Sequence, residues 1–168
     1  MGLGALSRWL RKDDPAWDGP LFRASAEGRG PDLLLLHGLA ASADTWREAR
    51  GRLGPDVRIH TVQLRGFAGL SGGGADRPAG PFLPQAARAL ADYLRAATRG
   101  PVAVAGHSMG GLLALMLARD QPDVVGRLMV VDVPAFFSLL ISPFATPTSV
   151  SALAAAARRR YLERDAAQ

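Results

Sequence analysis

Short apolar runs that lack polar alternation recur along the chain and predict buried strands at 32–36, 57–62, 102–105 and 127–134. Strands without alternation suit a parallel sheet that is covered on both faces. Between them, segments with apolar residues at helical spacing predict helices over 44–53, 82–98 and 111–118, and Asp44 is the expected N-cap of the first. Strands that alternate with helices predict an α/β fold, a mostly parallel sheet with flanking helices.

The two ends of the chain depart from this pattern. Residues 21–25 alternate weakly and predict an edge strand. Beyond Pro134 an apolar, proline-interrupted stretch leads to Thr146-Pro147, where we expect an alanine-rich helix that runs to about Asp165. We therefore divide the chain into an N-terminal tail at 1–19, a core at 20–134 and a further segment at 135–168.

Composition is that of one globular domain: 168 residues, of which 48% are hydrophobic and 21% charged. The formal net charge of +5 is spread along predicted helices and loops, with a single basic run at 158–160, so we expect no nucleic-acid partner. The chain has no cysteine, which excludes disulfides and thiolate metal sites. Neither a secretory signal nor an apolar run of about 20 residues is visible, so we expect no membrane span and a cytoplasmic protein.

The strongest chemical motif is Gly-x-Ser-x-Gly, read as Gly106-His107-Ser108-Met109-Gly110 between a predicted strand and a predicted helix. A serine at such a turn adopts a strained backbone that lifts its hydroxyl clear of the sheet, and the glycines avoid a collision of strand and helix. The helix that follows points free N–H groups at a developing oxyanion. Chance is the alternative in a chain with 19 glycines, but the strand–turn–helix context argues against it.

Several segments resemble the α/β-hydrolase superfamily over roughly residues 20 to 165. They are His37-Gly38 after one strand, 65–69 (RGFAG) after the next, the Ser108 motif, and 130–132 (VVD) after the following strand. The strings at 60–69 and 133–137 are similar to a bacterial group of single-domain hydrolases with a helical lid. The resemblance implies a serine hydrolase that acts on carboxylic esters or related acyl bonds.

The resemblance also implies roles for individual residues. Ser108 would be the nucleophile, and the backbone N–H groups of Leu39 and Met109 would form the oxyanion hole. Some family members place the acid of the triad at the position of Asp132, whereas others use an aspartate there only to bind backbone. Residues 135–168 match the beginning of the lid. The supporting positions are His37, Gly38, Gly106, His107 and Gly110.

A catalytic base is the missing part. In this superfamily the order is serine, acid, histidine, yet no histidine follows Ser108. His107 should leave the turn on the side away from the Ser108 hydroxyl, His60 lies mid-strand, and His37 suits a structural role in its loop. We expect that the chain covers only the N-terminal two-thirds of such a hydrolase and is weakly active or inactive alone.

A non-catalytic ligand-binding or interaction protein of the same fold is the alternative. Loss of later strands would leave 127–133 as a bare apolar edge, which predicts pairing with a partner through this edge strand. Otherwise the expected partner is a small-molecule ester or acyl substrate. The His and Asp residues lack metal-ligand spacing and 72–74 (GGG) lacks a phosphate-binding context, so we expect no metal and no cofactor.

Overall fold

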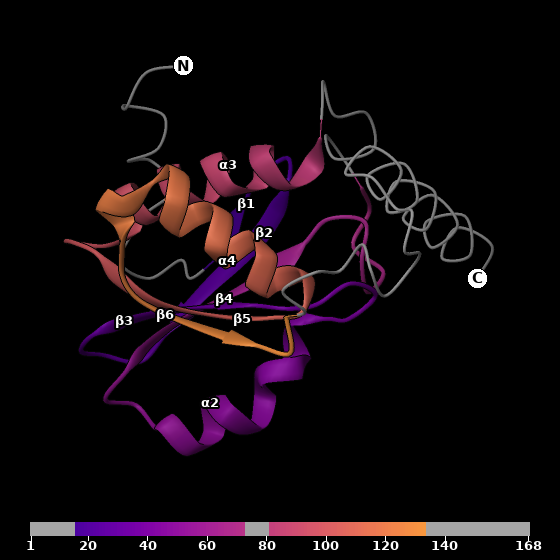
Figure 1. The fold of residues 1–168 in the computed structure, drawn as a ribbon. Coiled ribbons are helices and arrows are strands. Elements are labelled where there is room, and N and C mark those ends of the chain that lie inside the picture. Colours follow the sequence, from indigo (N-terminus) through magenta and orange to yellow (C-terminus); the bar gives the residue numbers. More distant parts are fainter. Residues whose placement is uncertain (1–15, 73–80, 134–168) are drawn as a thin grey trace.

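The computed structural model describes residues 16–72 and 81–133, and its centre is a six-stranded sheet in the order β1-β2-β4-β3-β5-β6 (Figure 1). β4, β3, β5 and β6 run parallel; at one edge β2 is antiparallel to β4, and β1 is antiparallel to β2. This arrangement confirms the predicted α/β class. The strands are β1 Ala16–Asp18, β2 Phe22–Glu27, β3 Asp32–Leu36, β4 Arg58–Leu64, β5 Val102–His107 and β6 Val125–Val131.

Helices cover the two faces of the sheet unequally. α3 and α4 lie side by side on one face, here called the α3/α4 face, and α2 lies on the other, the α2 face (Figure 1). Within the described ranges, none of the helices combines the length and the apolar character that a membrane crossing requires. The helices are η1 Ala43–Trp46, α2 Arg47–Leu53, α3 Phe82–Ala97, α4 Met109–Asp120 and η3 Pro122–Val124.

Alternate residues of β3 enter two separate cores. Leu34 and Leu36 belong to the large cluster of the α3/α4 face, which includes Leu90 of α3 and Leu113 of α4. Leu35 points to the α2 face and packs with a smaller cluster of three other buried residues, Trp46, Ile59 and Ala105. Because side chains alternate along a strand, the run of leucines in β3 supplies both cores.

Two local predictions were wrong. β2 is not an edge strand, because β1 pairs along its outer side with Ala16 opposite Ser25, and β1 lies within the range expected to be a tail. The first helical turn is capped by Ser42 and not by Asp44: the Ser42 hydroxyl accepts a hydrogen bond from the Asp44 N–H, so the helical segment begins earlier, at Ala43. The segment predicted at 135–168 lies outside the described residues.

Candidate active site at the carboxyl edge of the sheet

Ser108 occupies the turn between β5 and α4, as the motif predicts. Its φ of 51° and ψ of −117° lie far from the regions that a serine prefers. Such a conformation persists only where the surroundings enforce it, and it is characteristic of functional sites. The Ser108 N–H donates to the Val131 carbonyl at 2.9 Å, which ties the turn to the end of β6.

The glycines of the motif are required by close backbone contacts. A Cβ at Gly106 would collide with the Gly110 carbonyl, and a Cβ at Gly110 would collide with the carbonyls of Leu36 and His37. α4 therefore packs directly on the ends of β5 and β3. This contact brings the loop that follows β3 up to the serine, where a Cβ added to Gly38 would lie 3.3 Å from the Ser108 Cβ.

The backbone N–H groups of Leu39 and Met109, near Ser108, have no acceptor among the described residues and are available as donors. The next amides of α4 are already bonded: the N–H groups of Gly111 and Leu112 both donate to the Ser108 carbonyl, at 2.9 and 3.1 Å. The sequence positions of Met109 and Leu39, directly after the serine and directly after Gly38, are those expected for the oxyanion hole.

Positive φ angles at residues other than glycine gather at this edge of the sheet. In the part of the chain that the structure describes they are Ala40, Ala68, Ser108 and Asp132, with φ between 51° and 55°. Each follows the carboxyl end of a different parallel strand, which is the edge where open α/β sheets place their sites. The sequence carries no signal for Ala40 or Ala68, because an alanine does not indicate a left-handed backbone.

His37 is a structural residue of the loop after β3. It is fully buried, its Nδ1–H donates to the Gly38 carbonyl at 2.8 Å, and its Nε2 accepts the Leu64 N–H at 3.1 Å. Burial lowers the pKa of the imidazole, although the bond to Gly38 acts in the opposite direction. Both ring nitrogens are occupied, so His37 holds the Gly38 loop against β4 and has no free nitrogen for a proton from Ser108.

His60 is bound in a polar network at the other end of the sheet. Its Nε2–H donates to the Asp32 carboxylate at 2.8 Å, and its Nδ1 accepts the Tyr93 hydroxyl at 2.7 Å. Burial lowers the pKa of His60, partly offset by Asp32, and burial raises the pKa of Tyr93 to about 12. Asp32 begins β3 whereas the site lies beyond its end, so His60 cannot reach Ser108.

His107 and Asp132 lie near each other beside the elbow. The His107 Nε2 is 3.9 Å from an Asp132 carboxylate oxygen, and the Asp132 side chain is 86% exposed. The His107 Nδ1 is buried without a partner among the described residues, and a Cβ added to Gly38 would lie 2.9 Å from it. Sequence reasoning missed this approach of His107 to Gly38, since only the fold brings the two loops together.

A metal site is not formed by the described residues. Within 16–72 and 81–133, no three His, Asp or Glu side chains gather in a way that could hold a metal ion. The candidate site consists of Ser108, the backbone amides beside it and the His107–Asp132 pair.

The comparisons with known proteins identify the family of the chain. Residues 33–168 match the model of the alpha/beta hydrolase family, and the chain belongs to that family. It is 35% identical over 105 residues to a pimeloyl-[acyl-carrier protein] methyl ester esterase of Vibrio vulnificus, a match that covers 62% of this chain and 38% of that protein. It is 38% identical over 107 residues to an esterase of Mycobacterium tuberculosis, which covers 63% of this chain and 34% of the relative.

A solved structure also matches the chain over part of its length. A marine microorganism esterase matches with a TM-score of 0.57 and 26% identity, over 67% of this chain and 41% of that one. The chain therefore spans well under half the length of these relatives.

Proposed function

We propose that this chain carries the nucleophile of a serine esterase and that Ser108 attacks a carboxylic ester or a related acyl bond of a small molecule. The observation that carries the proposal is the left-handed backbone of Ser108 at the carboxyl edge, next to two amides without acceptors among the described residues. The esterase relatives support the reaction class. A cytoplasmic location is part of the same proposal.

Attack by the Ser108 oxygen on the ester carbonyl would form a tetrahedral intermediate and place a negative charge on the former carbonyl oxygen. In the proposed mechanism the N–H groups of Leu39 and Met109 donate to that oxygen. Loss of one such donor in a serine hydrolase costs roughly 3 kcal/mol of barrier. Collapse of the intermediate then expels the alcohol and leaves an acyl group on Ser108, which water removes.

The proton of the Ser108 hydroxyl needs an acceptor. His37 and His60 have both ring nitrogens bonded, and His107 faces Asp132 and Gly38. We infer that the base is a histidine from polypeptide outside these 168 residues, and that the chain alone turns over slowly or not at all. Asp132, which follows β6, is retained as a candidate acid.

Covalent labelling tests the nucleophile. We expect a fluorophosphonate probe to label the folded chain at one site, slowly, and Ser108→Ala to abolish the label. Ser71→Ala is the matched control, because Ser71 is exposed in the loop after β4 and should label as wild type. A folded chain that does not label, or a label that survives Ser108→Ala, would contradict the proposal.

Chemical rescue tests the missing base. Imidazole in solution should accelerate hydrolysis of p-nitrophenyl acetate by the wild-type chain beyond the sum of the rates with imidazole alone and protein alone. The Ser108→Ala variant with the same imidazole measures the background. If the wild type and the variant respond alike, Ser108 is not activated by an external base.

A non-catalytic binding protein of the same fold is the second candidate. The strained Ser108 turn counts against it, since a pure binding site has no need of a strained serine. Absence of labelling in a protein that is folded by circular dichroism would favour this candidate over the esterase.

A further inference from the structure

The segment that joins β3 to η1, residues 37–42 and here called the Leu39 loop, carries one of the two free amides of the site. It turns through Ala40, whose φ of 55° is left-handed. An alanine adopts that conformation only where the surrounding structure enforces it. Within the loop the Ala41 N–H donates to the Gly38 carbonyl at 3.3 Å, which is a long bond. The shape of the loop therefore depends on contacts from outside it.

One side chain of β4, that of Gln63, bonds to both ends of the Leu39 loop. At the start of the loop its Nε2–H group donates to the His37 Nε2 at 3.2 Å. Directly after the loop, the Ala43 N–H donates to the Gln63 Oε1 at 2.9 Å. β3 and β4 are neighbours in the sheet, so a residue at the end of β4 reaches the segment that follows β3.

The same amide group also bonds to the backbone that follows β4. The Gln63 Nε2–H groups donate to the carbonyls of Leu64 at 3.1 Å and of Phe67 at 3.3 Å. Ala68, the next residue, has a left-handed φ of 52°. The Phe67 ring packs edge-on against His37, with the ring centroids 5.9 Å apart. Gln63 therefore joins two loops that each contain a left-handed alanine.

These contacts fix the orientation of the Gln63 amide. Its Oε1 meets one N–H donor, and its Nε2 meets three acceptors, two carbonyls and the His37 Nε2. The His37 Nε2 is an acceptor because the Nδ1–H donates to the Gly38 carbonyl. A reversed amide would set donor against donor at Ala43 and oxygen against acceptor elsewhere. The position therefore requires a side chain that both donates and accepts.

We propose that Gln63 is a positioning residue that holds the Leu39 N–H where it donates to the oxyanion formed at Ser108. Gly38, between His37 and Leu39, packs against the serine, and a Cβ added to it would lie 3.3 Å from the Ser108 Cβ. A displaced loop would move the Leu39 amide away, and such a donor acts only at hydrogen-bond distance. Gln63 acts through the loop and not on the substrate. The inference rests on the proposed function, since it concerns the oxyanion hole of that site.

Three variants remove the contacts in different ways. Gln63→Met keeps an unbranched side chain and removes every hydrogen bond. Gln63→Glu keeps the shape and the acceptor for Ala43, but sets a carboxylate oxygen against the three acceptors. Ala43→Pro deletes the donor to Oε1 alone, at the first residue of η1, where proline is favoured, so it tests the contact without a change in the core. Gln121→Glu is the matched control, because its Oε1 accepts from Arg95 beyond the far end of α4 and a carboxylate can do the same.

The rate of fluorophosphonate labelling at Ser108 measures the effect in samples that circular dichroism shows to be folded. We expect Gln63→Met and Gln63→Glu to label at least about tenfold more slowly than the wild type, because loss of one oxyanion donor costs about 10²–10³-fold in rate. Ala43→Pro should label more slowly by a smaller factor, and Gln121→Glu at the wild-type rate. A purely structural role would lower the free energy of unfolding and leave the labelling rate of the folded protein unchanged.

Nuclear magnetic resonance reports on the loop without need of a reactive Ser108. In Gln63→Met the Leu39 amide signal should shift, while that of Met109, held at the start of α4, should stay. In Gln63→Glu the ¹⁵N signal of the His37 Nε2 should move toward that of a protonated nitrogen, because the carboxylate favours a proton there. A Leu39 signal that does not shift, or a folded Gln63→Met variant that labels at the wild-type rate, would overturn the proposal. A wild type that does not label, with a Leu39 signal that shifts in the variant, rejects only the esterase proposal.

Discussion

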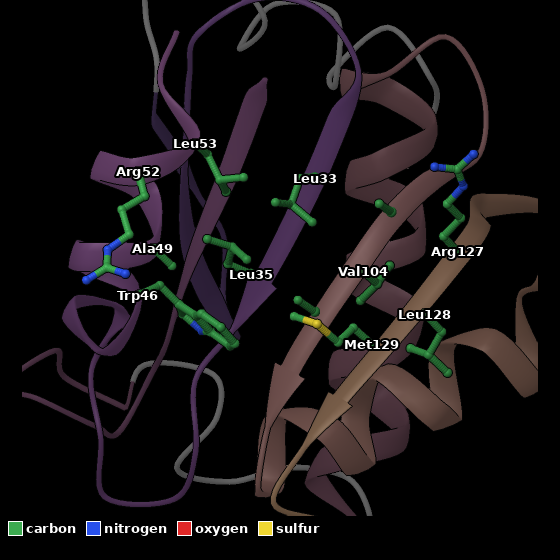
Figure 2. Close-up of a pocket in the computed structure, with 12 residues that line it drawn as sticks. Leu33, Leu35, Trp46, Ala49, Arg52, Leu53, Val104, Arg127, Leu128 and Met129 are labelled. Atoms are coloured by element: carbon green, nitrogen blue, oxygen red, sulfur yellow. The ribbon is translucent and has the colours of Figure 1, made fainter. Parts of the chain in front are cut away.

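The two faces of the sheet are built from the same strands and differ in how completely they are covered. On the α3/α4 face, helices of 16 and 12 residues close a continuous core that holds Leu34, Leu90 and Leu113 at 0% exposure. On the α2 face, a helix of 7 residues covers a cluster of four buried residues and leaves an open groove between α2 and β6 (Figure 2). The difference separates a closed core from a face on which the described residues leave a groove open.

The composition of the helices explains the difference. α3 buries six residues, including Leu90, Tyr93 and Leu94, along one stripe, whereas no residue of α2 is fully buried. α2 reads REARGRL and carries three arginines in seven positions, so Trp46 at its start makes the main contact. Burial of apolar area is the main favourable term in folding, so the α3/α4 face should dominate stability.

The largest effect is expected from a pair of adjacent leucines that face opposite ways. Leu34→Ala should destabilise by about 3–5 kcal/mol, because the closed core cannot collapse around the cavity. Leu35→Ala should cost about 2–3 kcal/mol, since its cluster borders the open groove and relaxes more easily. Chemical denaturation measures both. Equal losses would show that the α2 face is as tightly closed as its opposite.

The second expected effect is a loss of folding stability at acidic pH, caused by the buried histidines on the α3/α4 face. His60 is bonded to Tyr93 of α3, His37 packs on Phe67 of the same core, and burial lowers the pKa of both imidazoles. The unfolded chain binds protons at these histidines below about pH 6.5, where the folded chain still resists them. The contribution of these two histidines to the free energy of unfolding should therefore be fully present above about pH 6.5. Below that pH the free energy of unfolding should fall by up to about 1.4 kcal/mol per pH unit for each histidine.

Unfolding free energies at pH 7.5 and pH 5.5 measure this dependence. His60→Gln should reduce the slope, because it removes one titrating group. Tyr93→Phe is the matched variant, since it deletes the hydroxyl bonded to His60 but leaves the imidazole buried, and it should keep the slope. A wild-type stability that is constant between the two pH values would refute the prediction.

Most of the fold, and part of the site, follows from local patterns in the sequence. The uninterrupted apolar runs predict β3 and β5 because a strand buried on both faces needs apolar residues at every position. The Ser108 turn is predictable because glycine is required at the two positions where a Cβ would collide with neighbouring backbone. β1 was missed, since three residues at the end of an irregular segment acquire strand structure only by pairing with β2.

The groove and the His107–Gly38 contact could not be predicted, because both join segments distant in the chain. The same limit applies to Ala40 and Ala68, whose positive φ is imposed by the loops around them. These features depend on contacts between segments that are distant in the chain, and no residue spacing in the sequence indicates such contacts. The roles of Leu39, Met109 and Asp132 stay predictions that labelling and kinetics must test.

A third and smaller effect is expected in α2 itself. Gly51 lies inside this helix, is exposed, and has no atom within 4 Å of the position that a Cβ would occupy. Gly51→Ala should therefore stabilise the protein by about 0.5–1 kcal/mol through helix propensity alone. A thermal melt measures the gain. No change in stability, or a loss, would mean that α2 contributes less to the folded state than its contact with Leu35 implies.

The smallest effect on stability is expected at the exposed wall of the groove, where Met129 is 53% exposed. Met129→Gln removes apolar surface that is already in contact with water, so the free energy of unfolding should change by no more than about 0.5 kcal/mol. Solubility should rise, because the variant interrupts a run of four exposed apolar residues on β6, which has no neighbour on its outer side within 16–72 and 81–133. Denaturation and precipitation by ammonium sulfate measure the two quantities. A loss comparable to that of Leu35→Ala would show that Met129 is packed in the folded chain, and the contrast between a sealed face and an open one would then be wrong.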